Sequence, residues 1–267
     1  MSAPLDATAV KACCASAYAS DWASALLGDS MHPGGDALTE HLGELIGLGA
    51  ADDVLDVASG RGRSAMLLAR CFGCEVTGID YGSAAVAQAT SAARVAGLED
   101  RVRFRTADAE ALPFPSGSFT AAICECAFCT FPSKPAAAAE LARVVRPGGA
   151  VAISDLTRRA PLPPDLDGLL SWVACVADAR PEAEYAGLLE AAGLGVEVVE
   201  RHDAALADLV ATVRMRLLGA EVAARVKKLD LPGVDWSAAA RMAVAAGAAV
   251  RDGALGYAII VARRPGE

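Results

Sequence analysis

The sequence predicts an α/β fold built on a doubly wound, mostly parallel sheet of seven strands, and three observations point to it. Short apolar runs alternate with helical patterns from Val54 onward, the first run opens into a glycine-rich turn, and an apolar run over residues 254–263 closes the chain. We also expect a helical lid before the sheet and a helical insertion before its last strand.

These patterns divide the 267 residues into successive parts. The expected parts are an N-terminal helical lid (1–50), the main α/β domain (51–203), a helical cap insertion (204–252) and the closing strand of the sheet (253–267). A long helical insertion is unusual in a minimal doubly wound domain. Such insertions often cover or complete a binding site, so we expect this one to act as a cap.

The lid carries helical periodicity over residues 6–27 and 36–48, and the break Met31–Gly35 separates the two stretches. Because Tyr18 and Trp22 are four residues apart, we expect them to share a helix face. The expected strands cover residues 54–57, 74–80, 102–107, 119–124, 150–155, 196–200 and 254–263. The expected helices cover 64–71, 83–96, 134–145, 182–192 and two stretches within 204–250, and a turn at 146–149 precedes the fifth strand.

Composition favours a cytoplasmic protein that binds a small molecule. No apolar run is long enough to span a bilayer, and the N-terminus lacks the basic-then-apolar order of a secretory signal, so we expect no membrane partner. The net charge of -9 argues against nucleic acid as the main partner, because phosphate binding needs clustered Lys and Arg. Eight cysteines without a signal peptide are expected to be thiols rather than a disulfide framework.

The chain from Val54 to Arg63 reads V-L-D-V-A-S-G-R-G-R, which predicts a buried strand, a glycine turn and the start of a helix. Gly60 and Gly62 lack Cβ atoms where the backbone has to approach a ligand, and the helix N-terminus offers free N–H groups. The spacing differs from the dinucleotide pattern G-x-G-x-x-G, because no third glycine follows, so a pyrophosphate cradle is disfavoured. A tight turn without a ligand stays open at this point.

Three aspartates, Asp56, Asp80 and Asp108, come at the ends of the first three expected strands. Residues just past the carboxyl ends of parallel strands face one crevice. An acid roughly twenty residues past the glycine turn is placed to accept hydrogen bonds from both ribose hydroxyls of an adenosine, which favours Asp80. Asp108 is placed to meet the adenine amino group. Taken singly, each acid is better explained as a helix cap or a loop carboxylate, but their matching positions favour a shared site.

This ordered series resembles the class I S-adenosylmethionine-dependent methyltransferases. The motifs are the turn at 56–62, then Gly78-Ile79-Asp80, Ala107-Asp108-Ala109 and Arg146-Pro147-Gly148-Gly149, and they cover about residues 50–156. The one departure is Ala58, where the fuller glycine pattern often has Gly. The resemblance implies a Rossmann-like fold, S-adenosyl-L-methionine as the cofactor and methyl transfer as the reaction.

The resemblance also assigns roles to residues. It implies that the glycine turn lies under the methionine part of the cofactor, that Asp80 holds the ribose, and that Asp108 flanks adenine. Glu125 and Cys124, at the end of the fourth strand, are then expected near the transferred methyl group. The cofactor-binding residues expected in this way are Asp56, Ala58, Gly60, Gly62, Asp80, Tyr81, Asp108, Ala109 and Glu125.

Two cysteine positions resemble those of the arsenite methyltransferases. In those enzymes one cysteine follows the fourth strand and another precedes the next helix, as Cys126 and Cys175 do here. The resemblance implies that these two hold a trivalent arsenical, with Cys14 or Cys13 as a candidate third ligand. A soft metalloid suits thiolates, and its own lone pair attacks a methyl group without a base.

The cysteines also have simpler explanations. Cysteine packs well as a small buried apolar residue, and Cys71 and Cys74 need no other role. A structural zinc site that joins these two to residues 124–129 is disfavoured, because Cys74 begins one strand while its partners end another. We therefore expect no metal site.

The leading hypothesis is a methyltransferase that acts on arsenite or methylarsenite bound by Cys126 and Cys175. One alternative is O-, N- or C-methylation of a small organic nucleophile that Glu125, His32 or Tyr18 positions. Another is a metalloid-binding module without catalysis. For His32 alone, a loop histidine without a ligand is the simpler explanation.

Overall fold

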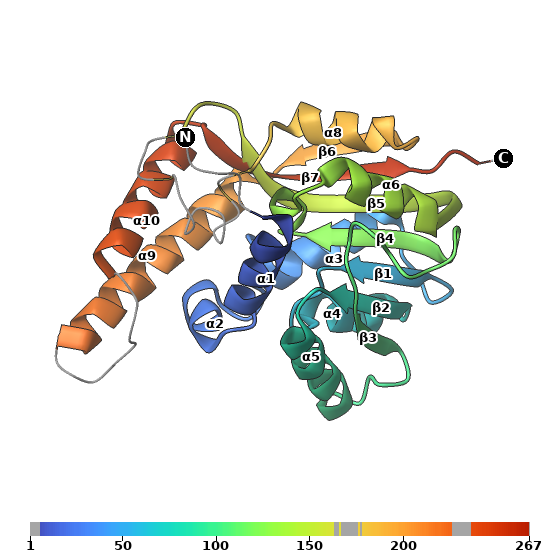
Figure 1. Ribbon diagram of the computed structural model, residues 1–267, viewed down its shortest axis with the longest axis horizontal. Coiled ribbons are helices and arrows are strands. Elements are labelled where there is room, and N and C mark those ends of the chain that lie inside the picture. Colours follow the sequence, from blue (N-terminus) through green and yellow to red (C-terminus); the bar gives the residue numbers. More distant parts are fainter. Residues whose placement is uncertain (1–5, 163–165, 167–175, 177, 226–235, 267) are drawn as a thin grey trace.

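The computed structural model describes residues 6–162, 166, 176, 178–225 and 236–266. A central sheet has helices packed on both faces, with α6 and α8 in front of it and α3 and α4 behind it in the view of Figure 1. The seven strands are β1 (Asp53–Val57), β2 (Glu75–Asp80), β3 (Val102–Thr106), β4 (Phe119–Glu125), β5 (Val145–Arg158), β6 (Gly195–Arg201) and β7 (Leu255–Arg263). The predicted α/β class and the seven strands are confirmed.

The strands lie in the order β3-β2-β1-β4-β5-β7-β6, and β7 runs antiparallel to both of its neighbours, β5 and β6. The central strands β1 and β4 are apolar on both faces, because helices cover both sides of a parallel sheet. Val54, Leu55 and Ile123 are accordingly fully buried. The order reverses at β1 and β4, and open α/β sheets bind ligands at such a switch point.

The helices of the sheet follow the predicted alternation. They are α4 (Arg63–Phe72), α5 (Ser83–Val95), the short 3-10 helix η1 (Phe128–Thr130), α6 (Lys134–Val144) and α8 (Glu182–Ala191). In α4, Ala65, Leu68 and Ala69 are buried at positions three and four apart, so one face of the helix packs on the sheet. α8 ends before Gly193, which takes a positive φ of 88°.

The N-terminal segment forms three helices, α1 (Ala7–Tyr18), α2 (Asp21–Leu27) and α3 (Gly35–Ile46). The continuous periodicity predicted over residues 6–27 is therefore wrong at one point. Ser20 stops the first helix and caps the second, since its Oγ accepts a hydrogen bond from the Ala23 N–H at 3.4 Å. The shared face predicted for Tyr18 and Trp22 is lost at this break, and Trp22 is 39% exposed.

The predicted turn at 146–149 also differs from the structure, because these residues lie inside β5. Phe119 pairs with Val145, and the pairing of β4 and β5 then resumes at Ala121 and Ala150. Residues 146–149 lie between these two pairs and form an irregularity in β5, where Gly148 takes a positive φ of 78°. Proline and glycine predicted the local bend correctly, but the pairing continues through it.

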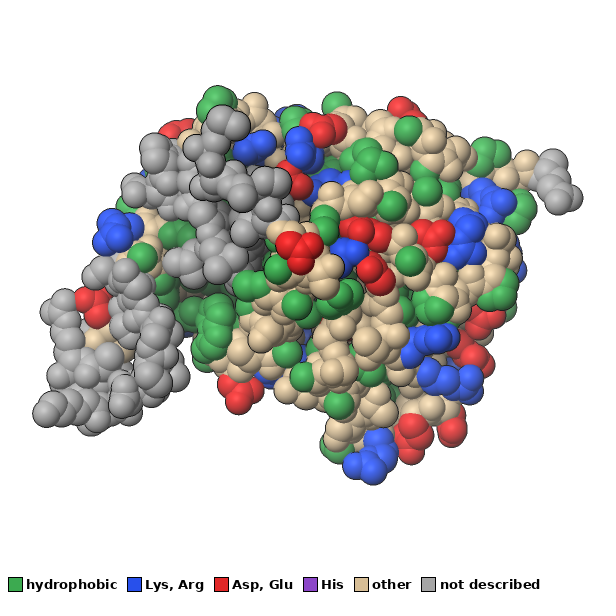
Figure 2. All heavy atoms as spheres, viewed as in Figure 1, with side chains coloured by type: hydrophobic (Ala, Val, Ile, Leu, Met, Phe, Trp, Pro, Cys, Tyr) green, Lys and Arg blue, Asp and Glu red, His purple; other side chains and the backbone are tan. Residues whose placement is uncertain are grey.

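The C-terminal insertion consists of α9 (Asp203–Arg225) and α10 (Trp236–Arg251), which project together from one end of the sheet (Figure 1). Arg216 on α9 donates a hydrogen bond to the Leu26 carbonyl at 2.7 Å, so the insertion contacts the lid helices. None of the described helices has the length and apolarity needed to cross a membrane. Acidic and basic side chains are interspersed on the face in Figure 2.

Candidate active site

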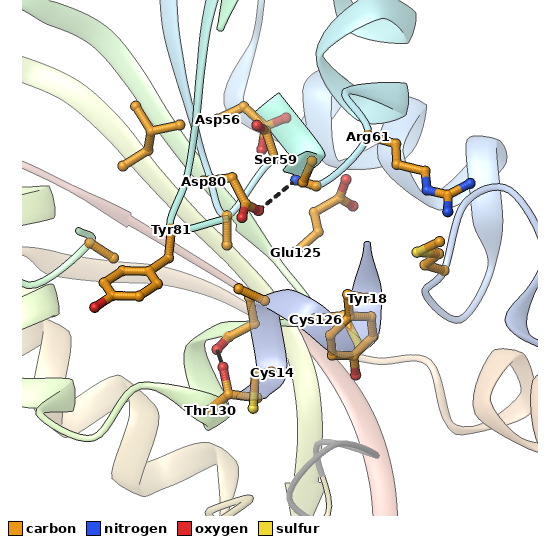
Figure 3. A pocket seen from close by; sticks show the side chains of 18 of the residues that line it. Cys14, Tyr18, Asp56, Ser59, Arg61, Asp80, Tyr81, Glu125, Cys126 and Thr130 are labelled. Carbon is orange, nitrogen blue, oxygen red and sulfur yellow. Dashed lines mark hydrogen bonds between the residues drawn. The ribbon is translucent and has the colours of Figure 1, made fainter. Parts of the chain in front are cut away.

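A cavity opens at the carboxyl ends of β1, β2 and β4, and α1 and the loop before α3 close its other side (Figure 3). Ten of the predicted site residues line it: Cys14, Asp56, Ala58, Gly60, Asp80, Tyr81, Asp108, Ala109, Glu125 and Cys126. Gly62 is not among the lining residues, and Cys175 lies outside the described part of the chain. The motifs spread along the sequence therefore converge on one site.

The glycine turn joins β1 to α4. Gly60 takes a positive φ of 52° and its N–H donates to Asp80 Oδ2 at 2.9 Å. Gly62 takes a φ of 80°, and a Cβ there would lie 2.3 Å from the Phe104 ring. Gly62 is thus needed for its backbone conformation and for packing against β3, which is a different reason from the ligand approach that the sequence suggested.

Asp80 ends β2 and its carboxylate is fixed by two backbone donors. Besides Gly60, the Gly82 N–H donates to Asp80 Oδ1 at 2.7 Å. Burial raises the pKa of Asp80, while these two hydrogen bonds act in the opposite direction. The side chain is preorganised, because both backbone donors point at it before any ligand binds.

Asp56 lines the cavity and is 2% exposed. Burial, together with the charges of Glu125 and Asp80, raises its pKa well above the ordinary value. Among the described residues, Asp56 Oδ2 and Ser59 Oγ are buried atoms without a hydrogen-bond partner. Buried acceptors without partners are costly, so these atoms fit a ligand that brings donors and positive charge. S-adenosylmethionine fits these acceptor atoms, because its ammonium group donates hydrogen bonds and both its ammonium and its sulfonium group are positively charged.

Strained backbone conformations gather around the cavity. Of the described residues other than glycine, Met31, Ala58 and Cys126 have a positive φ, at 56°, 60° and 52°, and all three line the cavity. The left-handed region costs a residue with a Cβ about 1–2 kcal/mol. Such strain concentrates at functional sites, and at Ala58 it explains why related patterns often place a glycine there.

A buried polar cluster forms the wall beside Glu125. Thr39 on α3 donates through Oγ1 to Glu125 Oε2 at 2.9 Å, and His32 Nε2 lies 3.3 Å from that hydroxyl and 3.8 Å from Glu125 Oε2. His32 Nδ1 lies 3.1 Å from the Pro33 carbonyl oxygen, which only an Nδ1–H can satisfy. Nδ1 therefore carries a hydrogen, and Nε2 faces the Thr39 hydroxyl and the Glu125 carboxylate.

The cluster extends from Glu125 into the sheet. Ser154 Oγ on β5 donates to Glu125 Oε1 at 3.4 Å, and the Tyr257 hydroxyl on β7 donates to Ser154 Oγ at 3.0 Å. Burial raises the pKa of Tyr257 well above its ordinary value, with Cys126 and Glu125 adding to the effect. Tyr257 is thus a permanent donor, and three strands and one helix hold the carboxylate of Glu125.

Two cations tie the lid to the sheet. Lys11 on α1 donates to Asp108 Oδ2 at 2.8 Å and to Glu110 Oε2 at 2.6 Å. Arg61, in the glycine turn, donates to the Ala19 carbonyl at 2.9 Å. Asp108, the predicted adenine ligand, therefore also forms an ion pair with the N-terminal helix α1.

The cysteines fall into groups. Cys14 and Cys126 line the cavity, and Figure 3 shows them on the side away from Asp56. Cys124 and Cys129 are buried in the core at 0% and 1% exposure, and Cys124 does not line the cavity, unlike its neighbour Glu125, with which it was expected near the methyl group. Sequence reasoning missed Lys11, Arg61 and Thr39 as site residues, because each contacts a distant segment, and it also missed the unpartnered hydroxyl of Ser59.

Comparison with known proteins agrees with this geometry. Residues 54–149 match a family described as "Methyltransferase domain". Methyltransferase GfsG of Streptomyces halstedii is 34% identical over 169 residues, which are 62% of this chain and 61% of that protein. The 27-O-demethylrifamycin SV methyltransferase of Amycolatopsis mediterranei is 36% identical over 118 residues, 44% of this chain and 43% of that protein. The crystal structure of the [4+2]-cyclase SpnF aligns with a TM-score of 0.71 at 25% identity and covers 87% of this chain and 82% of that one.

The fold is the Rossmann-like methyltransferase fold, and residues 54–149 of the chain match a methyltransferase domain. The chain spans less than two thirds of each of these two curated relatives, 61% of one and 43% of the other. The substrates in the names of these relatives therefore apply to those proteins and are not transferred to this chain.

The arsenical expectation finds only partial support in the comparisons. An arsenite methyltransferase of Halobacterium salinarum is 31% identical over 156 residues, 57% of this chain and 40% of that protein. It stands beside relatives named O-methyltransferase and demethylmenaquinone methyltransferase. The comparisons thus do not single out arsenic, and they agree better with methylation of a small organic molecule.

Proposed function

We propose that the protein transfers a methyl group from S-adenosylmethionine to an oxygen, or to the carbon beside it, of a small hydroxylated organic molecule. The relatives that carry the names of O-methyltransferases and quinone methyltransferases support this substrate class. In the proposal, residues 51–203 hold the cofactor, residues 1–50 act as the lid, and residues 204–252 act as the cap. Residues 253–267 close the sheet.

Asp80 and its backbone donors form the ribose site of the proposal. Asp108 and Ala109 lie beside adenine, and the turn around Gly60 lies under the methionine part, near the unpartnered oxygen of Asp56. Bound S-adenosylmethionine supplies an electrophilic methyl group on a positive sulfur. The buried carboxylates of Asp56 and Glu125 favour that charge, because they lie in a poorly solvated cavity.

The single observation that carries the proposal is the buried cluster of His32, Thr39 and Glu125 at the cavity wall. A hydroxyl nucleophile has to lose its proton as it attacks, whereas a trivalent arsenical does not. His32 Nε2 accepts that proton, and Glu125, 3.8 Å away, stabilises the imidazolium that forms. Thr39 holds the two side chains together, and the lid excludes water from the reacting groups.

The experiment is product analysis with S-adenosylmethionine that carries an isotopic methyl label. Purified protein is incubated with hydroquinones and hydroxylated polyketides in one arm, and with arsenite or methylarsenite plus a thiol reductant in the other. The proposal expects label on oxygen or carbon of an organic product, detected by mass spectrometry. Label on arsenic alone contradicts the substrate class.

The arsenical is the second candidate, and the position of Cys14 and Cys126 on the cavity wall favours it. These two thiols, with Cys175 from outside the described residues, make up the predicted ligand set. If this candidate holds, Cys126→Ser and Cys175→Ser each abolish labelled arsenical while S-adenosylmethionine still binds. His32→Asn then leaves the rate unchanged.

A further inference from the structure

A second cluster of chemically active side chains lies outside the cavity, where α3 meets the edge strand β6. His41 Nε2 lies 2.7 Å from Glu200 Oε2, and His202 Nε2 lies 3.3 Å from the same oxygen. One ligand atom from each of the three residues lies within 4.8 Å of the others. The two imidazole rings meet edge to face with centroids 5.8 Å apart. Two of the three histidines of the chain thus meet at one carboxylate.

The backbone presents these side chains to the same point. Glu200 is in β6 and His202 follows two residues later, so their side chains leave the same face of an extended chain. The His202 N–H donates to the Tyr257 carbonyl at 2.7 Å, which continues the pairing with β7 beyond the end of β6. His41 comes from the exposed side of α3, whose other face is anchored by the buried Leu38 and Leu42.

A carboxylate on the Nδ1 side of the ring also orients His41. Glu44, three residues later on α3, places Oε2 3.8 Å from His41 Nδ1. An acceptor on that side suits hydrogen on Nδ1 once a metal ion takes the place of the hydrogen between Nε2 and Glu200. Metal-binding histidines commonly have a carboxylate behind them in this way.

We propose that His41, Glu200 and His202 form a binding site for a divalent transition metal ion, with Zn²⁺ as the ion that best suits the ligands. Two imidazoles and one carboxylate are the ligands that Zn²⁺ takes at three-residue sites, and Mg²⁺ and Ca²⁺ prefer oxygen alone. The side chains are 38%, 36% and 23% exposed, so an ion reaches them and solvent fills its remaining position.

The contacts within the cluster agree with this assignment. The Nε2 atoms of His41 and His202 both lie against Glu200 Oε2, so the three ligand atoms already face one point. A bound ion replaces the proton shared between His41 and Glu200. It also links α3 to β6 across 159 residues of sequence, and α3 is the helix that carries Thr39. We therefore expect the ion to stabilise the fold.

The test is metal binding by chelator-treated full-length protein. Zn²⁺ is titrated in competition with a chromogenic chelator, and thermal unfolding is followed with and without Zn²⁺. Wild type is expected to bind one ion at this site and to unfold at a higher temperature with Zn²⁺. His41→Ala and His202→Ala are expected to bind at least about 100-fold more weakly and to lose the thermal shift, and Glu44→Gln to bind about 10–100-fold more weakly.

Glu197→Gln is the matched control, since it removes an acid from the same strand that pairs with Arg263 instead. It is expected to keep wild-type affinity and the full thermal shift. The absorption of bound Co²⁺ separates imidazole from thiolate ligands, because thiolate adds an intense charge-transfer band. The proposal is overturned if His41→Ala and His202→Ala, folded by circular dichroism, bind Zn²⁺ as tightly as wild type. A thiolate band that persists in both variants overturns it as well.

Discussion

The two halves of the cavity are built in different ways. The half at the sheet comes from short contiguous motifs, in which Gly60 and Gly82 hold Asp80 through backbone N–H groups within one βαβ unit. The half at the lid comes from side chains far apart in the sequence, such as Lys11 with Asp108 and Thr39 with Glu125, which are 97 and 86 residues apart. The sheet half, where the cofactor is proposed to bind, is therefore local and preformed, whereas the lid half, proposed for the substrate, depends on how the N-terminal helices dock.

Because the two halves are built differently, mutations in the sheet half and in the lid half are expected to have different effects. Changes in the sheet half act on the binding of S-adenosylmethionine, and changes in the lid half act on the chemical step or on access to the cavity. The variants below test that separation, from the largest expected effect to the smallest.

Replacing the proposed base gives the largest effect. His32→Asn keeps a polar side chain and removes the proton acceptor, so the methyl-transfer rate to a hydroxyl substrate is expected to fall roughly 10²–10⁴-fold. Affinity for S-adenosylmethionine, measured by calorimetry, is expected to stay at the wild-type value. A rate that stays unchanged, with an unchanged pH profile, shows that His32 has only a structural role.

Replacing the buried carboxylate in the sheet half changes affinity and stability in opposite directions. Asp56→Asn is expected to weaken S-adenosylmethionine binding about ten-fold, because a charged acceptor becomes neutral. The protein without cofactor is expected to become more stable, because the variant removes a charge that burial and neighbouring acids disfavour.

The pH dependence of this stability has a definite sign. The folded-state pKa of Asp56 lies above its unfolded value, so ionisation costs wild-type stability as pH rises from the unfolded towards the folded pKa. The stability advantage of Asp56→Asn, measured by urea unfolding, is thus expected to grow over that range and then level off. Asp53→Asn, at the exposed start of β1, is the control and is expected to show no such trend. An advantage that shrinks with rising pH contradicts the account.

Releasing the lid gives the smallest effect. Lys11→Met removes the ion pairs to Asp108 and Glu110, and dissociation of S-adenosylmethionine is expected to become up to about five-fold faster in stopped-flow measurements. Although burial lowers the pKa of Lys11, its hydrogen bonds to the two acids raise it overall. The ion pairs of Lys11 with Asp108 and Glu110 are therefore formed at neutral pH, and they are lost as pH rises through the raised pKa of Lys11. Arg94→Met, on the exposed side of α5, is the control; an equal effect there shows general charge attraction instead.

Much of the fold and of the cofactor half could be predicted from the sequence, for a physical reason. Alternating apolar strands and helices, and glycines and acids at strand ends, are local signals, and they placed Asp56, Gly60, Asp80 and Asp108 around one cavity. Local signals gave a wrong prediction where a side-chain cap or the pairing of two strands determined the structure instead. Ser20 splits the first helix, and β5 continues through the glycine bend at 146–149.

The lid contacts and the metal cluster could not be predicted in this way. No local pattern connects Lys11 with Asp108, or His41 with His202, because only the packing of helices on the completed sheet brings them together. The expectation of no metal site considered only the cysteines for this reason. Likewise, the role of Gly62 depends on Phe104, a residue of β3 that only the folded sheet places against the turn.

The most direct test of the account is calorimetric titration of S-adenosylmethionine into wild type and Asp80→Ala. Wild type is expected to bind one cofactor per chain. Asp80→Ala is expected to bind roughly 10- to 150-fold more weakly, because hydrogen bonds to the ribose through a charged acceptor are lost. Glu75→Ala, at the exposed opposite end of β2, is expected to match wild type. Wild-type affinity in a folded Asp80→Ala variant would contradict the placement of the cofactor on which the account depends.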